Sequence, residues 1–199
     1  MLDKTVPFID VLMLRKAGVP VPVYPLAEGY AFTLFQPGDE KEWAEIETSV
    51  LEFKRSVDAL EYFQRNFLPS LSELQRRCLF VQGPDGNKIA TATIWWEYTG
   101  KRRDPWVSWV SVRPEYQGKG LGKALISEVL RLGIEIEGDR DFYLKTQTWS
   151  YRAITIYEKV GFEIISDKNL WRYSNERYQE AIALLEDIYQ KNGYQRRRS

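Results

Sequence analysis

A run of glycines and lysines near the middle of the chain has the composition of a phosphate-binding loop. It comprises Gln117-Gly118-Lys119-Gly120-Leu121-Gly122-Lys123, between a stretch rich in β-formers and a stretch with helical periodicity. A loop that opens a helix presents main-chain N–H groups without intrahelical partners, together with the positive end of the helix dipole. Because glycine has no Cβ atom, phosphate oxygens can approach its main chain closely. The segment therefore predicts a site for a phosphate or a diphosphate.

Two common phosphate-binding motifs do not fit this loop. The P-loop requires Ser or Thr after its lysine, whereas Lys123 is followed by Ala124. The dinucleotide motif Gly-x-Gly-x-x-Gly meets Lys123 at its last glycine when it is started at Gly118, and Leu125 when it is started at Gly120. Both motifs are therefore excluded.

The pattern that fits is Gln/Arg-x-x-Gly-x-Gly/Ala, formed by Gln117, Gly120 and Gly122. It closely resembles the coenzyme A diphosphate loop of the GNAT superfamily of acyl-CoA-dependent N-acyltransferases. Pro114 and Tyr116 ahead of the loop, and its position between a strand and a helix, make the resemblance specific.

A second segment, residues 150–162, resembles the C-terminal signature of the same family, Asn-x-x-Ala-x-x-x-Tyr-x-x-x-Gly-Phe. Ser150 stands where asparagine is usual, so a hydroxyl replaces the side-chain amide as a contact for the cofactor. The resemblance covers about residues 30–173.

The resemblance implies that acetyl-CoA is the acyl donor, as a cosubstrate, and that the chain needs no metal. The pantetheine arm would enter between two splayed strands, where main-chain groups of the first strand bind it and one amide polarises the thioester carbonyl. The cofactor-binding residues expected on this basis are Val110, Ser111, Val112, Gln117, Gly118, Lys119, Gly120, Leu121, Gly122, Lys123 and Ser150.

The resemblance also suggests residues for proton transfer. Tyr157 aligns with the tyrosine proposed to protonate the departing thiolate, although its place on the apolar face of a helix also suits a core residue. Asp104, at the start of the motif strand, and Glu97, across the predicted hairpin, are candidate bases. Either carboxylate could instead be a solvated surface charge, and a chain of water molecules could take the proton.

The absence of histidine narrows the chemistry. Without histidine, a Ser-His-Asp triad, a Cys-His pair and a histidine-ligated metal are excluded. The one cysteine, Cys78, excludes an internal disulfide and a cysteine-rich zinc site. We expect Cys78 to be buried and inert, with an acyl-cysteine intermediate as the alternative.

Strand and helix patterns alternate along the chain. Strands are expected at residues 30–35, 79–81, 89–98, 106–112, 142–146, 162–165 and 170–173, and helices around 40–50, 56–67, 68–77, 120–137, 151–160 and 176–190. Strands 89–98 and 106–112 suit an antiparallel hairpin. This order predicts an α/β fold (α+β mixed sheet). The resemblance adds a central, mostly antiparallel sheet that is splayed between two strands, with helices on both faces.

Three segments are expected. Residues 1–28 are proline-rich and form an extended N-terminal arm lying on the domain, residues 29–174 form the acyltransferase domain, and residues 175–199 form a C-terminal helix and a basic tail. The basic cluster Arg196–Arg198 is expected to be solvated.

Bulk properties suggest a cytoplasmic enzyme. Lys and Arg number 28, as do Asp and Glu, so no net field favours nucleic acid or a membrane. We find no signal peptide and no apolar run of the roughly 20 residues that a membrane helix needs. A homodimer through the last helix is an open alternative.

Together these features predict an N-acetyltransferase that moves an acetyl group from acetyl-CoA to a primary amine, on a small molecule or a peptide, by direct attack. The alternatives are a non-catalytic acyl-CoA-binding module and a transferase of a longer acyl group. Aromatic side chains near the expected cleft suit core positions, and those that face the cleft could hold a cationic amine by cation–π contact. They are Trp95, Trp96, Tyr98, Trp106, Trp109 and Trp149.

Overall fold

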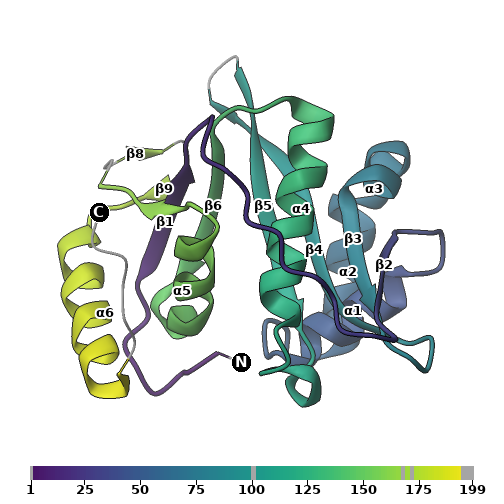
Figure 1. The fold of residues 1–199 in the computed structure, drawn as a ribbon, viewed down its shortest axis with the longest axis horizontal. Helices are drawn as coiled ribbons and strands as arrows, with labels where there is room; N and C mark the ends of the chain where they lie inside the picture. The colour runs from purple at the N-terminus through teal and green to yellow at the C-terminus, as the bar shows by residue number, and fades with distance from the viewer. Residues whose placement is uncertain (1, 100–101, 167–168, 171–172, 194–199) are drawn as a thin grey trace.

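The computed structural model describes residues 2–99, 102–166, 169–170 and 173–193 (Figure 1). The strands are β1 (Asp10–Arg15), β2 (Ala31–Leu34), β3 (Cys78–Gln82), β4 (Lys88–Thr99), β5 (Arg102–Val112), β6 (Phe142–Gln147), β7 (Glu163–Ile164), β8 (Asn169–Leu170) and β9 (Tyr173–Ser174). The α-helices are α1 (Glu40–Ser49), α2 (Ser56–Asn66), α3 (Leu71–Arg77), α4 (Leu121–Glu137), α5 (Tyr151–Lys159) and α6 (Tyr178–Asn192). Three short 3₁₀ turns are η1 (Leu68–Ser70), η2 (Pro114–Tyr116) and η3 (Thr148–Ser150).

Seven strands form one sheet in the order β2-β3-β4-β5-β6-β1-β7, and β8 pairs with β9. Neighbours in the large sheet are antiparallel except β5 and β6, which are parallel. These two strands pair only at Trp106–Tyr143 and Val107–Leu144, so they diverge beyond that contact. The mixed, mostly antiparallel and splayed sheet expected from the sequence is confirmed.

Helices cover both faces of the sheet (Figure 1). On one face α4 buries Leu125 and Val129 in the main core, which α5 and α6 also enter. On the other face a second core joins Trp43 of α1 and Phe63 of α2 to Phe80 of β3. The layers follow from the helical spacing of the apolar residues, which gives each helix one face to bury.

The N-terminal segment does more than lie on the domain. Its residues 10–15 form β1, which lies between β6 and β7 and pairs antiparallel with both. Val11, Leu12 and Met13 are buried. A continuous apolar run is typical of a strand that is covered on both faces. Part of the expected arm is therefore an interior strand of the sheet.

The C-terminal helix α6 belongs to the main core. Leu185 and Ile188 are buried there, and the hydroxyl of Tyr189 donates a hydrogen bond of 3.1 Å to the carbonyl of Tyr151. Its apolar face is thus used within the chain. The basic cluster at 196–198 lies outside the described residues. Among the helices that the structure describes, none has the length and apolar character of a membrane span.

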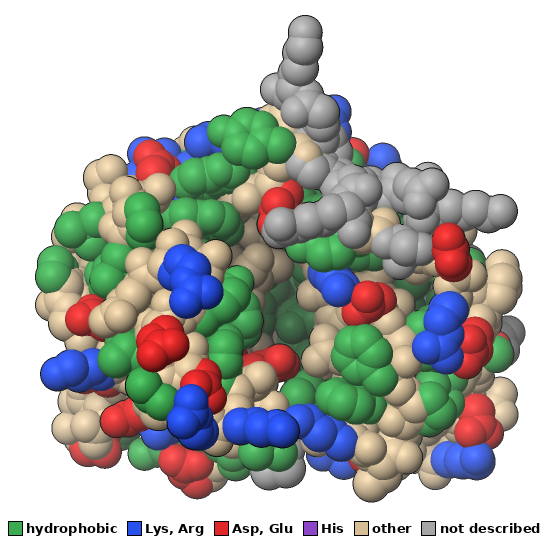
Figure 2. All heavy atoms as spheres, turned by 180° about the vertical axis from the view of Figure 1, so that it is seen from behind, with side chains coloured by type: hydrophobic (Ala, Val, Ile, Leu, Met, Phe, Trp, Pro, Cys, Tyr) green, Lys and Arg blue, Asp and Glu red, His purple; other side chains and the backbone are tan. Residues whose placement is uncertain are grey.

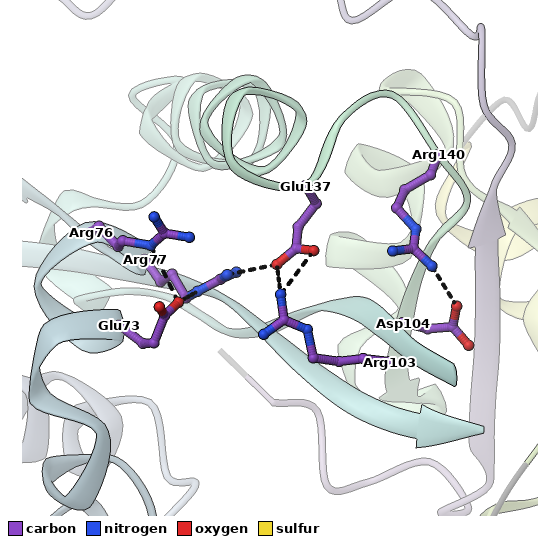
Figure 3. A network of polar contacts seen from close by, with 7 residues as sticks. All are labelled: Glu73, Arg76, Arg77, Arg103, Asp104, Glu137 and Arg140. Carbon is purple, nitrogen blue, oxygen red and sulfur yellow. Dashed lines mark hydrogen bonds and ion pairs between the residues drawn. The ribbon is translucent and has the colours of Figure 1, made fainter. Parts of the chain in front are cut away.

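A network of charged side chains fixes the β4–β5 hairpin to the helices (Figure 3). Glu137, the last residue of α4, accepts hydrogen bonds from Arg77 of α3 at 2.6 Å and from Arg103 of β5 at 2.9 Å. Arg77 is fully buried and also donates to Glu73 at 2.5 Å. The guanidinium groups of Arg77 and Arg103 lie 5.1 and 5.0 Å from the ring centroid of Trp96. The network therefore holds Trp96 in place.

Candidate active site

A cleft of about 1290 Å³ opens where β5 and β6 diverge. Its walls come from α1, α2, β4, β5, the glycine loop, β6 and α5. In Figure 2 the molecule is hollowed near the middle of the face, with hydrophobic side chains inside the hollow and Lys and Arg side chains along its lower rim. The cleft brings together most of the residues that the sequence singled out.

The glycine loop reaches this cleft just before α4 begins. Gly118 and Gly120 have positive φ angles of 80° and 82°, and a Cβ atom at either position would meet nothing within 4 Å. In the part of the chain that the structure describes, no main-chain N–H group from Gly118 to Gly122 donates a hydrogen bond. Five adjacent donors at a helix N-terminus are what a diphosphate requires.

The polar side chains of the loop differ in their contacts and in whether they line the cleft. The side-chain amide of Gln117 donates a hydrogen bond of 2.8 Å to the carbonyl of Val112 and so fastens the loop to the end of β5. Lys123 lines the cleft. Lys119 is exposed and lies 4.8 Å from the ring centroid of Tyr116, outside the cleft lining.

Strand β5 carries a bulge beside the cleft. Thr91 faces Ser111 and Thr93 faces Ser108, so two residues of β5 oppose one of β4. Trp109, in the bulge, has a positive φ of 55°. A bulge frees main-chain groups from the ladder and redirects them. Val110, Ser111 and Val112 follow Trp109 and line the cleft, as expected for the strand that binds the pantetheine arm.

The opposite wall contains Ser150 and Tyr157. Ser150 precedes α5, and its hydroxyl lies 3.3 Å from the side-chain amide of Gln147, which donates to it. The amide of Gln147 also lies 3.5 Å from Glu52. Tyr157 is buried but lines the cleft. Burial, with smaller contributions from the charges of Glu52 and Glu47, raises the pKa of the Tyr157 hydroxyl, which therefore stays protonated at neutral pH.

The two carboxylates considered as bases have different places. Glu97 and Asp104 lie opposite each other in the β4–β5 ladder, as expected, and Glu97 lines the cleft. Asp104 is only 1% exposed and lies outside the cleft lining. Its Oδ1 atom is 2.7 Å from Arg102. The same atom is 3.2 Å from Arg140 (Figure 3). Asp104 is therefore held in ion pairs away from the cleft.

A third carboxylate, which we did not anticipate, lies inside the cleft. Glu47 of α1 is fully buried, and its Oε2 accepts a hydrogen bond of 2.9 Å from Ser111. Its Oε1 has no hydrogen-bond partner among the described residues. Burial, with a smaller contribution from the charge of Glu52, raises the pKa of this carboxyl to about 8, although the hydrogen bond from Ser111 lowers it. The signal in the sequence is a glutamate within the apolar stripe formed by Trp43, Ile46 and Val50.

Aromatic side chains line the same cleft as Glu47. Tyr62, Phe67, Trp95 and Trp109 all line the cleft. Tyr62 and Trp109 lie 5.1 Å apart, and Phe67 and Trp95 lie 5.0 Å apart, between ring centroids. Trp43 of α1 packs edge-on against Trp109 at 5.2 Å. These rings therefore pack together and face the cleft at the same time.

Cys78 lies away from this chemistry. It is fully buried at the start of β3, and burial raises the pKa of its thiol to about 11. A buried, protonated thiol is a poor nucleophile. Within the described residues, no group of three or more His, Cys, Asp or Glu side chains could hold a metal ion.

Comparisons with known proteins agree with this geometry. The model of the acetyltransferase (GNAT) family matches residues 40–162. The match spans more than half of the chain, so the chain belongs to the GNAT family of acetyltransferases. This confirms the resemblance inferred from the glycine loop and the segment at residues 150–162.

The relatives are distant. The thialysine N-epsilon-acetyltransferase of Sus scrofa is 26% identical over 116 residues, which cover 57% of this chain and 63% of that protein. The enzyme of the same name from Bos taurus is 27% identical over 85 residues, covering 41% and 49%. The chain thus spans less than two thirds of either relative.

The fold has solved counterparts. A GCN5-related N-acetyltransferase from Sphaerobacter thermophilus superposes with a TM-score of 0.61 at 20% identity, over 78% of this chain and 48% of that one. This likeness confirms the fold.

Proposed function

We propose that this chain is an N-acetyltransferase that moves the acetyl group of acetyl-CoA to a primary amine by direct attack. The observation that carries the proposal is one cleft that both the glycine loop and Tyr157 line. The loop has the unpartnered N–H groups that a diphosphate needs. Membership of an acetyltransferase family supports the same activity.

In this proposal the donor lies along β5. The diphosphate binds the N–H groups of residues 118–122, and Lys123 adds positive charge. The pantetheine arm follows Val112, Ser111 and Val110 in the gap that β6 leaves. A main-chain N–H of the bulge then donates to the thioester oxygen, which gains negative charge as the amine attacks.

Tyr157 would stabilise the leaving group. The thiol of coenzyme A has a pKa of about 8.5, as a simple thiol does, whereas burial raises the pKa of Tyr157 above its ordinary value. Full transfer of the phenol proton is therefore unfavourable, and the hydroxyl acts as a hydrogen-bond donor to the developing thiolate. The proton that finally makes the free thiol comes from the attacking nitrogen.

The curated relatives are named for acetylating an ε-nitrogen, that of thialysine. Those names support an amine as the acceptor here.

The proposal is tested with the full chain, acetyl-CoA and a panel of primary amines, by measuring free thiol and the mass of each product. Release of thiol together with a product heavier by one acetyl group is the expected result. Saturable binding of acetyl-CoA without thiol release would instead favour a non-catalytic acyl-CoA-binding module. A higher rate with a longer acyl-CoA would show that the enzyme transfers that acyl group in preference to acetyl.

A further inference from the structure

Glu47 is a buried carboxylate that lines the cleft, and no basic side chain among the described residues pairs with it. Of its two oxygens, Oε2 accepts from Ser111, and Oε1 has no partner among the described residues. A buried polar atom without a hydrogen bond is unfavourable, so native structures rarely keep one unless a ligand or water completes it. Because Glu47 lines the cleft, a ligand in the cleft can reach that oxygen.

The surroundings of Glu47 select a cationic ligand. Glu52 also lines the cleft, and its charge acts on both Glu47 and Tyr157. Lys145, which lines the cleft, pairs with Asp10 at 3.0 Å. Lys4 donates to the carbonyl of Leu51 at 3.2 Å, and its charge acts on Glu52 but is not among the causes that shift the pKa of Glu47. Carboxylates and aromatic rings that line one cleft attract an ammonium group.

The position of Glu47 places this charge beside the reacting atoms of the donor. Ser111, which donates to Glu47, belongs to the strand segment assigned above to the pantetheine arm. Tyr157, on the facing helix, feels the charge of Glu47. The carboxylate therefore contacts the donor strand through Ser111 and shares the cleft with the leaving-group tyrosine.

We propose that Glu47 binds the ammonium group of the acceptor and takes its proton, and that the acceptor is a cationic primary amine whose carbon skeleton lies against Tyr62 and Trp109. This inference rests on the proposed acetyl transfer. It assigns the base to α1, in place of the two hairpin carboxylates.

The proton balance is complete. The acceptor ammonium gives one proton to Oε1 of Glu47 and becomes a free amine. Its nitrogen forms a bond to the thioester carbon, and the carbon–sulfur bond breaks. The second proton of the nitrogen goes to the thiolate, giving the amide and free coenzyme A. Glu47 then returns its proton to water, so each turnover releases one proton.

The test compares two acceptors that differ in whether they need a base. 2-Phenylethylamine is protonated at neutral pH, whereas the fluorines of 2,2,2-trifluoroethylamine lower its basicity so that it is largely free amine. Glu47→Gln keeps the shape and the hydrogen bond from Ser111 but cannot take a proton. We expect it to lose about 100-fold or more in kcat/KM with 2-phenylethylamine and less than about 10-fold with 2,2,2-trifluoroethylamine.

A matched control is Glu45→Gln. Glu45 is exposed on the same helix, where it pairs with Arg113 at 2.9 Å, and its replacement should leave both rates unchanged. Acetyl-CoA affinity, measured by calorimetry, should be the same in all three proteins. Equal losses with both amines would overturn the role of Glu47 alone. No thiol release by the unaltered protein with either amine, although acetyl-CoA binds, would overturn the proposed function and this inference with it.

A second variant covers the case in which Glu47→Gln does not fold. Ser111→Ala keeps the acid and removes the hydrogen bond that favours its charged form. The groups that face Glu47 are then Glu52 and Tyr157, both unchanged. In the pH profile of kcat/KM with 2-phenylethylamine, the rise on the acidic side should move to higher pH, because the hydrogen bond that lowers the pKa of Glu47 is lost. A rise that stays in place would contradict the assignment.

Discussion

Tyr157 and Glu47 line the same cleft, and their environments suit different tasks. Burial keeps the tyrosine hydroxyl protonated, so it can donate a hydrogen bond to a thiolate. Burial also makes the glutamate a stronger base than an exposed carboxylate. The tyrosine is therefore suited to donate a hydrogen bond, and the glutamate is suited to accept a proton.

Replacing Tyr157 by Phe removes only the hydroxyl and leaves the ring in the core. We expect kcat to fall about 10- to 100-fold, the value of one hydrogen bond to a charged group. The dissociation constant for acetyl-CoA should change less than about threefold, because the ground state lacks the thiolate. Single-turnover thiol release and calorimetry measure the two quantities. An unchanged kcat would mean that Tyr157 is a core residue only.

Glu47 should also make stability depend on pH. The folded state raises the pKa of its carboxyl from 4.5 to about 8, so between these values the folded chain holds a proton that the unfolded chain releases. The protein therefore loses stability as pH rises through this window, and Glu47→Gln does not. We compare the free energy of unfolding of Glu47→Gln with that of the unaltered protein at two pH values. The difference should be more favourable to the variant at pH 8.5 than at pH 4 by on the order of 2–4 kcal/mol. Denaturant unfolding at both pH values checks this, and an equal difference at both would contradict it.

At the scale of elements, the glycine loop depends on main-chain conformation as well as charge. Gly120→Ala and Gly120→Glu both place a residue with a Cβ atom at a positive φ. Both variants should therefore lose about 1–2 kcal/mol in the free energy of unfolding. Only the glutamate puts negative charge where the diphosphate is expected. By calorimetry, the alanine variant should bind coenzyme A within about 10-fold of the unaltered protein, and the glutamate variant at least about 100-fold more weakly. Equal affinities of the two variants for coenzyme A would contradict the assignment of the diphosphate to this loop.

The hairpin that carries the aromatic wall depends on Glu137. Glu137→Gln removes the negative charge that pairs with the buried Arg77. Arg77 keeps its ion pair with Glu73. We expect a loss of about 2 kcal/mol, below the 3–5 kcal/mol of a fully broken buried pair, and a fall of about 4–8 °C in Tm. Glu128→Gln on the same helix breaks only the surface pair with Arg131 and should change stability by less than about 1 kcal/mol. Equal effects of the two variants would contradict an anchoring role for the network.

The sequence was most informative where local rules decide the structure. The loop at residues 117–123, the β4–β5 hairpin and the amphipathic α4 follow from turn chemistry and periodicity. Glu47 was missed because a glutamate on a short helix is normally solvated, and its burial depends on contact with Ser111, distant in the sequence. Asp104 shows the reverse case, since its partner Arg140 comes from a loop that no local pattern connects with it.

At the scale of the whole molecule, the sheet consists of two halves that meet at two residue pairs of β5 and β6. Strand β1 lies within the second half, between β6 and β7, although it comes first in the sequence. Its apolar run lacks alternation because both faces are covered. The prolines of residues 1–28 favoured an extended arm instead. The cleft is the space between the halves, and the glycine loop and Glu47 reach it from the first half.

The most direct measurement of the central claim is a crystal structure of the chain with coenzyme A. We predict diphosphate oxygens about 2.7–3.2 Å from main-chain nitrogens between Gly118 and Gly122, with the pantetheine arm running along Val112, Ser111 and Val110 toward Glu47 and Tyr157. Coenzyme A bound elsewhere, or with those nitrogens turned away from its phosphates, would contradict the account.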